Sequence, residues 1–242
     1  MTIPEIQQKL YEKLKSSGWG NKLKMFVLSK DFENILMTLY NDSQNGKRFT
    51  PTLKQLFRGF EECPYDKLKV IIVTENPYPN ANIADGIAFS CSNIAKEEQA
   101  LTYLFDEIER TVYNPNKPAE ESVQARKDYG LDLKRWSNQG VLLLNTSMTT
   151  QVGSTKGHKE LWKPFVTYLF DMLSTYNTGL CYVFLGAEGK NWSKAVASSN
   201  YKFFTSEPIS AYYHPDKQWN SGNLFNQINK VLMNNYGDKI IW

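Results

Sequence analysis

Residues Lys69–Ser90 read KVIIVTENPYPNANIADGIAFS. An apolar, largely β-branched run, Val70–Val73, stops at Thr74 and is followed by two prolines, three asparagines and an Asp-Gly pair. Such a run predicts a buried strand, and the Pro/Asn/Gly cluster after it predicts a loop. In an open α/β sheet, ligands bind beyond the carboxyl ends of the strands, so this loop is a candidate site. The alternative is an ordinary strand-to-helix connection.

The rest of the chain alternates between predicted strands and predicted helices. Further strands are expected at Gly140–Asn145, Leu180–Leu185 and Tyr201–Thr205. Helical spacing of apolar residues is found in 1–62, Glu97–Val112, Leu131–Asn138, Leu161–Ser174, Asn191–Ala197 and Asn223–Asn234. This alternation predicts a three-layer α/β/α sandwich around a central four-stranded parallel sheet. We expect one domain, 1–242, with the helical segment 1–62 packed on it and Tyr113–Asp128 as a surface excursion.

Composition restricts the classes of function. With 41% hydrophobic and 14% aromatic residues, the chain is typical of globular proteins. Its net charge of +3 neither requires nor excludes nucleic acid, so any phosphate-binding surface must be local. Three widely spaced cysteines and two histidines argue against a disulfide framework or an iron–sulfur or zinc site, and no metal or cofactor is expected.

The expected location is intracellular, in the cytoplasm. No apolar run has the length needed to cross a bilayer, and the charged, amphipathic N-terminus is unlike a signal peptide. The abundance of Asn, Lys and Tyr is compatible with AT-rich coding DNA of a bacterial or viral source.

A second strand-to-loop junction resembles the first. The apolar strand Val141–Leu144 delivers Asn145 at its carboxyl end, and small hydroxylated residues follow. An Asn side chain presents both a donor and an acceptor, which suits it to read the edge of an amide-like heterocycle. The alternative is a turn-forming Asn that bonds its own backbone.

A third segment, Tyr212–Gly222, contains a histidine in a polar loop. His214 is followed by Pro215, and such a side chain can donate a hydrogen bond to developing negative charge. A structural histidine bonded to the backbone is the alternative. The stretch Gly186–Asn191 superficially suggests a phosphate-cradling loop, but its glycine spacing is too short and the Ser/Thr after Lys190 is missing. It predicts the start of a helix instead.

Taken in order, these motifs resemble the uracil-DNA glycosylase family, most closely its family 1. Thr74–Tyr78 stands where that family has Gly-Gln-Asp-Pro-Tyr, its water-activating motif. Gly86–Ser90 is similar to Gly-Leu-Ala-Phe-Ser, and Gly140–Thr146 is nearly identical to the strand that ends in the uracil-reading Asn. His214-Pro215 matches the start of the His-Pro-Ser-Pro-Leu loop. Weaker similarity extends over most of the chain.

The resemblance implies a DNA glycosylase that hydrolyses the N-glycosidic bond of uracil and leaves an abasic site, as in base excision repair. The nucleotide would be flipped out of the duplex into a pocket. Phe89 would stack on the uracil, and Asn145 would read its amide edge and disfavour cytosine. Tyr78 would reject the methyl group of thymine. His214 would hydrogen-bond the leaving uracil anion.

The resemblance also implies contacts with single- or double-stranded DNA. Gln218 or Trp219 would fill the gap left in the base stack. Candidate phosphate contacts are Ser154, Thr155, Lys156, His158 and Lys217. A monomer is expected, and the resemblance allows for a proteinaceous glycosylase inhibitor or a replication protein as a partner.

The main departure from the family pattern is Asn76, which replaces an Asp. An amide can orient a water molecule, but it cannot accept a proton near neutral pH and carries no charge. Mismatch-specific relatives, with Gly-Ile-Asn-Pro-Gly, also have Asn there. We expect Glu75 to supply the missing charge. Two alternatives remain: a uracil-DNA or DNA-binding accessory protein with little catalytic activity, and a glycosylase with a shifted base specificity.

Overall fold

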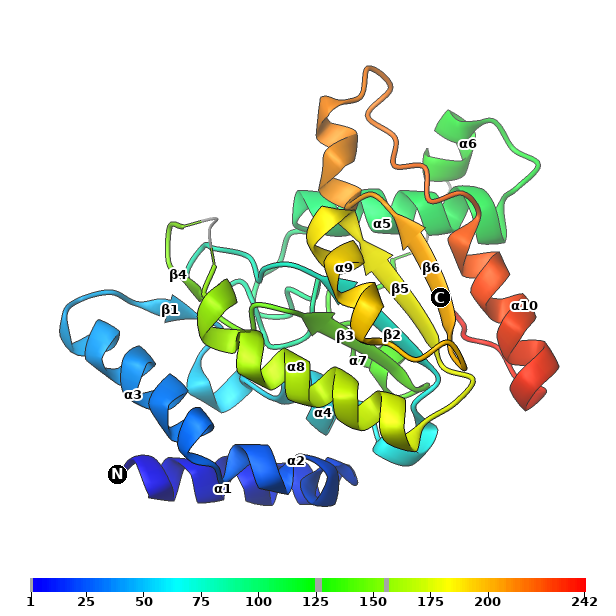
Figure 1. Ribbon diagram of the computed structural model, residues 1–242. Coiled ribbons are helices and arrows are strands. Elements are labelled where there is room, and N and C mark those ends of the chain that lie inside the picture. The colour runs from blue at the N-terminus through cyan, green and yellow to red at the C-terminus, as the bar shows by residue number, and fades with distance from the viewer. Residues whose placement is uncertain (1, 125–127, 155–156) are drawn as a thin grey trace.

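The computed structural model describes residues 2–124, 128–154 and 157–242. Its centre is a four-stranded sheet in which all strands run parallel, in the order β3-β2-β5-β6 (Figure 1). The strands are β2 (Val70–Thr74), β3 (Val141–Asn145), β5 (Cys181–Leu185) and β6 (Tyr201–Thr205). The predicted parallel sheet is confirmed, and each predicted strand is found to within one residue.

Helices cover both faces of the sheet, because successive strand residues point to opposite sides. Ile71 and Val73 face one core, while Val70 and Ile72 face the other. The first core is covered by α1 (Ile3–Lys15), α2 (Trp19–Val27), α3 (Lys30–Gln44), α4 (Arg58–Glu61) and α8 (Lys159–Tyr176). The second is covered by α5 (Gln99–Ile108), α7 (Lys134–Ser137) and α10 (Leu224–Tyr236). The predicted three layers are the result (Figure 1).

The N-terminal region is mainly helical, as predicted for 1–62, and a short ribbon ties it to a loop near the sheet. Helix α1 begins after Thr2, whose side chain forms a reciprocal capping box with Glu5. Strand β1 (Phe49–Thr50), which was not predicted from the sequence, pairs antiparallel with β4 (Thr150–Gln151). This ribbon holds the loop after β3 against the N-terminal segment.

One long predicted helix is interrupted. Residues Glu97–Val112 form α5 and then a π-helical turn, η3 (Glu109–Tyr113). The buried carboxylate of Glu109 accepts hydrogen bonds from Asn114 and Tyr129, which fixes the chain as it leaves the helix. The remaining short elements are η1 (Leu53–Gln55), η2 (Tyr65–Lys67), α6 (Ala119–Gln124), α9 (Gly186–Trp192), η4 (Ser193–Ala195) and η5 (Pro208–Tyr213).

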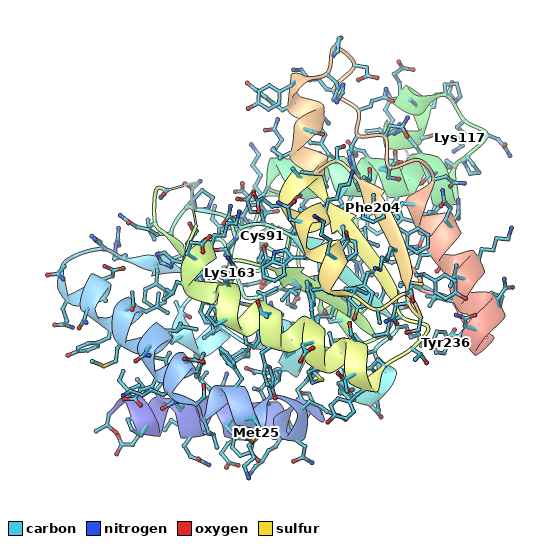
Figure 2. All side chains as sticks on the ribbon, viewed as in Figure 1. Met25, Cys91, Lys117, Lys163, Phe204 and Tyr236 are labelled. Carbon is cyan, nitrogen blue, oxygen red and sulfur yellow. The ribbon has the colours of Figure 1, made fainter. Side chains whose placement is uncertain are left out.

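The surroundings of β5 and β6 follow from their positions in the sheet. Helix α9 begins at Gly186, earlier than the predicted start at Asn191, because Gly186 turns the chain directly after β5 with φ +65°. Strand β6 lies at the edge of the sheet and carries Phe204, which is labelled in Figure 2. Phe204 is 51% exposed and stacks on Phe184. Among the helices within the described ranges, none is both long and apolar enough to cross a membrane.

Candidate active site

The two predicted junctions meet at the carboxyl edge of the sheet. Thr74 at the end of β2 lies directly opposite Asn145 at the end of β3. The loops that follow stay together, because Thr146 N donates to Thr74 O at 2.9 Å and Ser147 N donates to Glu75 O at 2.9 Å. Residues that are distant in sequence therefore form one site.

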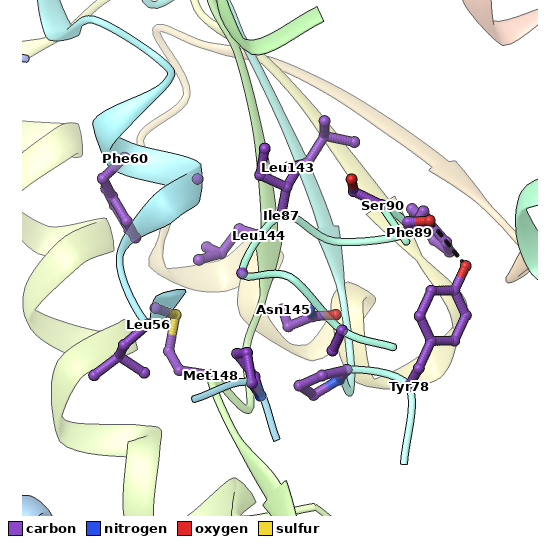
Figure 3. A pocket seen from close by; sticks show the side chains of 15 residues that line it. Leu56, Phe60, Tyr78, Ile87, Phe89, Ser90, Leu143, Leu144, Asn145 and Met148 are labelled. Carbon is purple, nitrogen blue, oxygen red and sulfur yellow. Dashed lines mark hydrogen bonds between the residues drawn. The ribbon is translucent and has the colours of Figure 1, made fainter. Parts of the chain in front are cut away.

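A small enclosed cavity, here called the inner pocket, lies between these loops. Its volume is ≈ 20 Å³, which is space for about one water molecule. Figure 3 shows the Asn145 amide in the middle of this pocket, with Tyr78 and Phe89 on one side. The lining residues are Pro51, Leu56, Gly59, Phe60, Pro77, Tyr78, Ala84, Gly86, Ile87, Phe89, Ser90, Leu143, Leu144, Asn145 and Met148.

Phe89 occupies an unusual backbone conformation. Its φ is +64°, a region that a bulky side chain adopts only when its surroundings impose it. The Tyr78 hydroxyl donates to Phe89 O at 2.9 Å, and Ala88 N donates to Leu143 O at 3.3 Å. Burial raises the pKa of Tyr78 well above its ordinary value, so the phenol stays protonated and keeps donating. The Phe89 ring is thus fixed before any ligand arrives.

A buried ion cluster holds the loop that carries Phe89. Asp85 is fully buried and pairs with the Arg58 guanidinium at 2.8 Å, and Arg58 also binds both oxygens of Asp132 at 2.7 Å. Asp85 further accepts hydrogen bonds from the hydroxyls of Ser90 and Ser92, both at 2.6 Å. A buried carboxylate with this many donors stabilises one loop conformation and opposes others.

A second, larger cavity, here called the outer cleft, adjoins the inner pocket. Its volume is ≈ 360 Å³, and the two cavities share Pro77, Tyr78 and Phe89 in their walls. The lining residues are Thr74, Glu75, Asn76, Pro77, Tyr78, Pro79, Phe89, Glu98, Gln99, Ala100, Glu207 and Ile209. The outer cleft therefore contains Asn76 and Glu75, whereas the inner pocket contains Asn145.

The Asn76 side chain is covered by the loop after β3. A Cβ atom added to Gly157 would lie 1.9 Å from Asn76 Oδ1 and 2.7 Å from Ser147 Oγ. Gly157 also has φ +55°, so glycine is required here both by conformation and by the close approach. The backbone of this loop thus lies directly against the Asn76 amide.

Two residues of the outer cleft, Glu207 and Ile209, were not predicted from the sequence. The carboxylate of Glu207 accepts from Thr74 Oγ1 at 2.8 and 2.9 Å, and burial raises its pKa to about 7. Ile209 is 42% exposed although it is apolar. Both follow β6. The sequence could have indicated them, because the carboxyl end of every strand in a parallel sheet lies at the same edge. The junction after the fourth strand belongs with the other two.

The structure places His214 apart from both cavities. It is exposed, its backbone N donates to Ala211 O at 3.0 Å, and it lines neither the inner pocket nor the outer cleft. Figure 1 shows why: η5 and the loop after it (orange) project beyond the carboxyl edge of the sheet. In this conformation His214 therefore lies outside the site at which the predicted contact with a leaving base would be made.

The two candidates for insertion into the base stack are also held elsewhere. Trp219 is 2% exposed and its indole donates to Ser206 O at 3.1 Å, so it belongs to the core. Gln218 is half-buried and accepts from Arg110 at 3.0 Å. Lys217 is exposed, and its ammonium group lies 4.7 Å from the centre of the Tyr212 ring.

The predicted phosphate contacts after β3 are placed only partly. Thr155 and Lys156 lie outside the described residues. Ser154 is half-buried, and its carbonyl accepts from Thr150 Oγ1 at 3.0 Å. His158 lies at the start of α8 with Nδ1 2.8 Å from Thr149 Oγ1, and burial lowers its pKa. A neutral, bonded imidazole is a poor phosphate ligand, so its structural role at the helix start is better supported.

Comparison with known proteins gives a consistent result. A family model described as the uracil DNA glycosylase superfamily matches residues 60–233. A uracil-DNA glycosylase of Acinetobacter baumannii (strain SDF) is 27% identical over 216 residues, which cover 87% of this chain and 86% of that protein. One from Francisella tularensis subsp. holarctica (strain LVS) is 28% identical over 215 residues, with 87% and 91% covered.

Solved structures share the fold. The mimivirus uracil-DNA glycosylase superposes with a TM-score of 0.78 at 21% identity, covering 95% of this chain and 88% of that one. A mimivirus UNG variant in complex with UGI gives 0.75 at 22% identity, with 95% and 90% covered. The UNG of Nitratifractor salsuginis gives 0.61 at 18% identity, with 91% and 96% covered.

Proposed function

The chain belongs to the uracil-DNA glycosylase superfamily, and from this premise we propose that it excises uracil from DNA. The activity is hydrolysis of the N-glycosidic bond, which leaves an abasic site for base excision repair. Enzymes of this superfamily act on DNA, and uracil-DNA glycosylases related to this chain span 87% of its length. We further propose that residues 1–242 act as a single domain and as a monomer.

The inner pocket is the proposed binding site for the flipped base. Phe89 would stack on the uracil ring, and the Asn145 amide would pair with N3–H and O4. Tyr78 would occupy the space beside C5 and exclude a methyl group there. The observation that carries this proposal is the position of the Asn145 amide inside a pocket that Tyr78 and Phe89 help to line.

The inner pocket must open before a base can enter. At ≈ 20 Å³ it cannot hold a pyrimidine. Its walls include strand residues and the clamped Phe89 loop, so we propose that the pocket widens by movement of the unbranched Met148 side chain. Flipping a base costs a few kcal/mol of unstacking, and contacts made as the pocket closes around uracil would offset this cost.

The outer cleft is the proposed site of water and of the reacting sugar. Asn76 would orient the water that attacks C1′, and Glu75 would contribute negative charge close to the cationic sugar. Both line the cleft next to Phe89, where the sugar of a stacked uracil would lie. This arrangement supports hydrolysis rather than simple binding.

Ile209 is the proposed wedge that fills the gap in the base stack. It is exposed, apolar and fixed behind the buried Pro208, and it stands at the rim of the outer cleft. Apolar side chains of this kind are the ones that proteins insert between base steps. Lys217 and Ser154 remain proposed phosphate contacts. A proteinaceous inhibitor is a proposed partner, because a mimivirus UNG variant forms a complex with UGI.

The direct test is a glycosylase assay on single- and double-stranded oligonucleotides that contain one uracil. We expect release of uracil and strand scission at the abasic site after alkali treatment. The same oligonucleotide with thymine or cytosine at that position should stay intact. Tight binding of uracil DNA without release of the base would show an accessory binding protein and contradict the proposal.

A further inference from the structure

Glu207 is held at the carboxyl edge of the sheet by a hydrogen bond that passes over the end of one strand. It follows β6, yet its carboxylate reaches past the end of β5 to the end of β2, where it accepts from Thr74 Oγ1 at 2.8 and 2.9 Å. Thr74 is buried, and its hydroxyl has one proton, which the two carboxylate oxygens share. The carboxylate is thereby fixed where the Glu75–Asn76 loop begins.

The stem of Glu207 is closely packed, and the residue is part of the wall of the outer cleft. A Cβ atom added to Gly186 would lie 3.0 Å from Glu207 Cγ, so α9 starts in contact with this side chain. The next residue, Pro208, is buried and fixes the backbone. Glu207 nevertheless lines the cleft together with Asn76 and Phe89. A carboxyl group in this position can act on whatever enters the cleft.

The surroundings of Glu207 favour its protonated form more than water does. Burial raises the pKa of its carboxyl to about 7, the hydrogen bond from Thr74 opposes this shift, and the charge of Glu75 adds to it. A carboxyl group that titrates near neutral pH can take a proton and release it again within one reaction cycle. Such perturbed groups are frequent in active sites.

The other charged groups near the cleft single out Glu207 rather than Glu75. The titratable residues that line the cleft besides Glu207 are Glu75, Glu98 and Tyr78, and none of its described lining residues is basic. On α9, Glu188 forms an ion pair with Lys159, and the pKa of Lys159 is raised by Glu188 and also by Glu75. A cation therefore partly offsets the charge of Glu75.

The hydrolysis requires a proton acceptor that Asn76 cannot provide. As the glycosidic bond breaks, the sugar becomes cationic and the attacking water must lose a proton. We propose that the Glu207 carboxylate accepts this proton and supplies the negative charge that stabilises the cationic sugar. This catalytic role rests on the proposed glycosylase function, and the charge proposed for Glu75 adds to it.

The proposed step is balanced in atoms and electrons. The N1–C1′ bond breaks, and its electron pair leaves with uracil as an anion. The oxygen of the water oriented by Asn76 forms a bond to C1′, and one of its protons passes to the Glu207 carboxylate. Glu207 then gives that proton to the uracil anion or to solvent. Nothing is oxidised or reduced, and the products are uracil and an abasic sugar.

The first test compares Glu207→Gln with Glu12→Gln in single-turnover excision from a single-stranded uracil oligonucleotide. Gln keeps an acceptor for Thr74 but cannot take a proton, so we expect E207Q to lower the rate about 100-fold. Binding of the oligonucleotide should not change. E12Q removes a half-exposed charge on α1, outside both cavities, and should keep the wild-type rate. Glu207→Asp keeps a carboxylate and should keep some of the activity. Thermal unfolding verifies that each variant is folded.

The pH profile separates proton transfer from a merely structural role. The active form is the carboxylate, so the wild-type rate should rise with pH through about 7 and then level off. E207Q should lose this rise, whereas E12Q should keep it. A rise that persists unchanged in E207Q would overturn the assignment.

A second readout does not depend on turnover. Wild-type protein should bind an oligonucleotide with a cationic pyrrolidine in place of the sugar more tightly than one with neutral tetrahydrofuran, and E207Q should lose this preference. If the wild type excises uracil while E207Q retains both rate and preference, the inference about Glu207 is wrong and the glycosylase function stands. If the wild type releases no uracil, the proposed function fails. The analogue preference then still decides whether Glu207 meets a cationic sugar.

Discussion

The inner pocket and the outer cleft share three residues of their walls but are built in different ways. The inner pocket is small, mostly apolar and closed around one amide, Asn145. The outer cleft is larger and acidic, and it collects side chains from loops after β2 and β6 and from the start of α5. Recognition by shape needs a rigid scaffold, whereas stabilisation of a cation needs charge at low hydration. The two cavities divide these tasks between them.

The rigid scaffold of the inner pocket should be the feature most sensitive to mutation. Asp85→Ala leaves the Arg58 guanidinium without its buried partner and removes the acceptor of Ser90 and Ser92. Breaking a buried pair from one side costs about 3–5 kcal/mol, so we expect a loss of that size in the free energy of unfolding. Urea denaturation measures it.

The matched control for that change is Asp132→Ala. Asp132 pairs with the same guanidinium, but its side chain is 28% exposed, so water can replace some of the interaction. We expect a clearly smaller loss of stability than for D85A. Equal losses for the two variants would show that burial of Asp85 is not what fixes the Phe89 loop.

Recognition in the inner pocket should depend on Asn145 next. Asn145→Ala removes a donor and an acceptor that would face the base. It leaves two polar groups of uracil, N3–H and O4, without a partner. Each unpaired group costs about 1–3 kcal/mol, so excision should fall about 100-fold or more. Asn93→Ala, which lies outside the inner pocket, is the control and should keep the wild-type rate. An N145A variant with full activity would show that the base is read elsewhere.

The sequence predicted the inner pocket better than the outer cleft, for a physical reason. Strands such as Val70–Thr74 and Val141–Asn145 are continuous apolar runs that end in polar residues, and parallel pairing brings their ends together whatever the loops do. Strand β6 is an edge strand with no fully buried residue, so its end is less marked. The proposed role of Glu207 depends on its hydrogen bond with Thr74. This contact joins residues far apart in the sequence, so a local sequence pattern cannot predict it.

Loop length explains why His214 lies apart from both cavities. A histidine followed by proline in a polar loop is typical of a site residue. The six residues of η5 lie between Glu207 and His214, and they carry His214 away from the sheet. Loop length sets the reach of a side chain, and a motif of two residues cannot report it. For Trp219 the sequence predicted insertion into the base stack, but the side chain lies in the core. A large aromatic side chain after a loop is more often in the core.

The outer cleft should respond to added charge where the inner pocket does not. Asn76→Asp places a carboxylate next to the proposed water, and we expect uracil excision to rise about tenfold through general-base assistance. The like charge would also raise the pKa of Glu207 further, so the additional loss from E207Q should be smaller in this background. Single-turnover rates of the four variants in the cycle measure this coupling.

The control for that cycle is Asn80→Asp, which adds the same charge at an exposed position of the same loop. Its rate should match the wild type, because solvent screens a charge outside the cleft. If Asn76→Asp lowers the rate instead, the Asn76 amide is integral to the site, for example through its close contact with Gly157.

The smallest effects on excision should come from substitutions in the projecting segment after β6. They should differ between Ile209, near its start, and His214, near its end. Ile209→Ala shortens the proposed wedge and should slow excision from duplex DNA about tenfold, because the flipped state loses a few kcal/mol of support at most. Single-stranded substrate needs no wedge and should be cleaved as before. His214→Ala should change neither rate, since His214 lines neither cavity. A large loss in H214A on both substrates would mean that η5 folds down over the outer cleft when DNA binds, and the division between the two cavities would then hold only for the free protein.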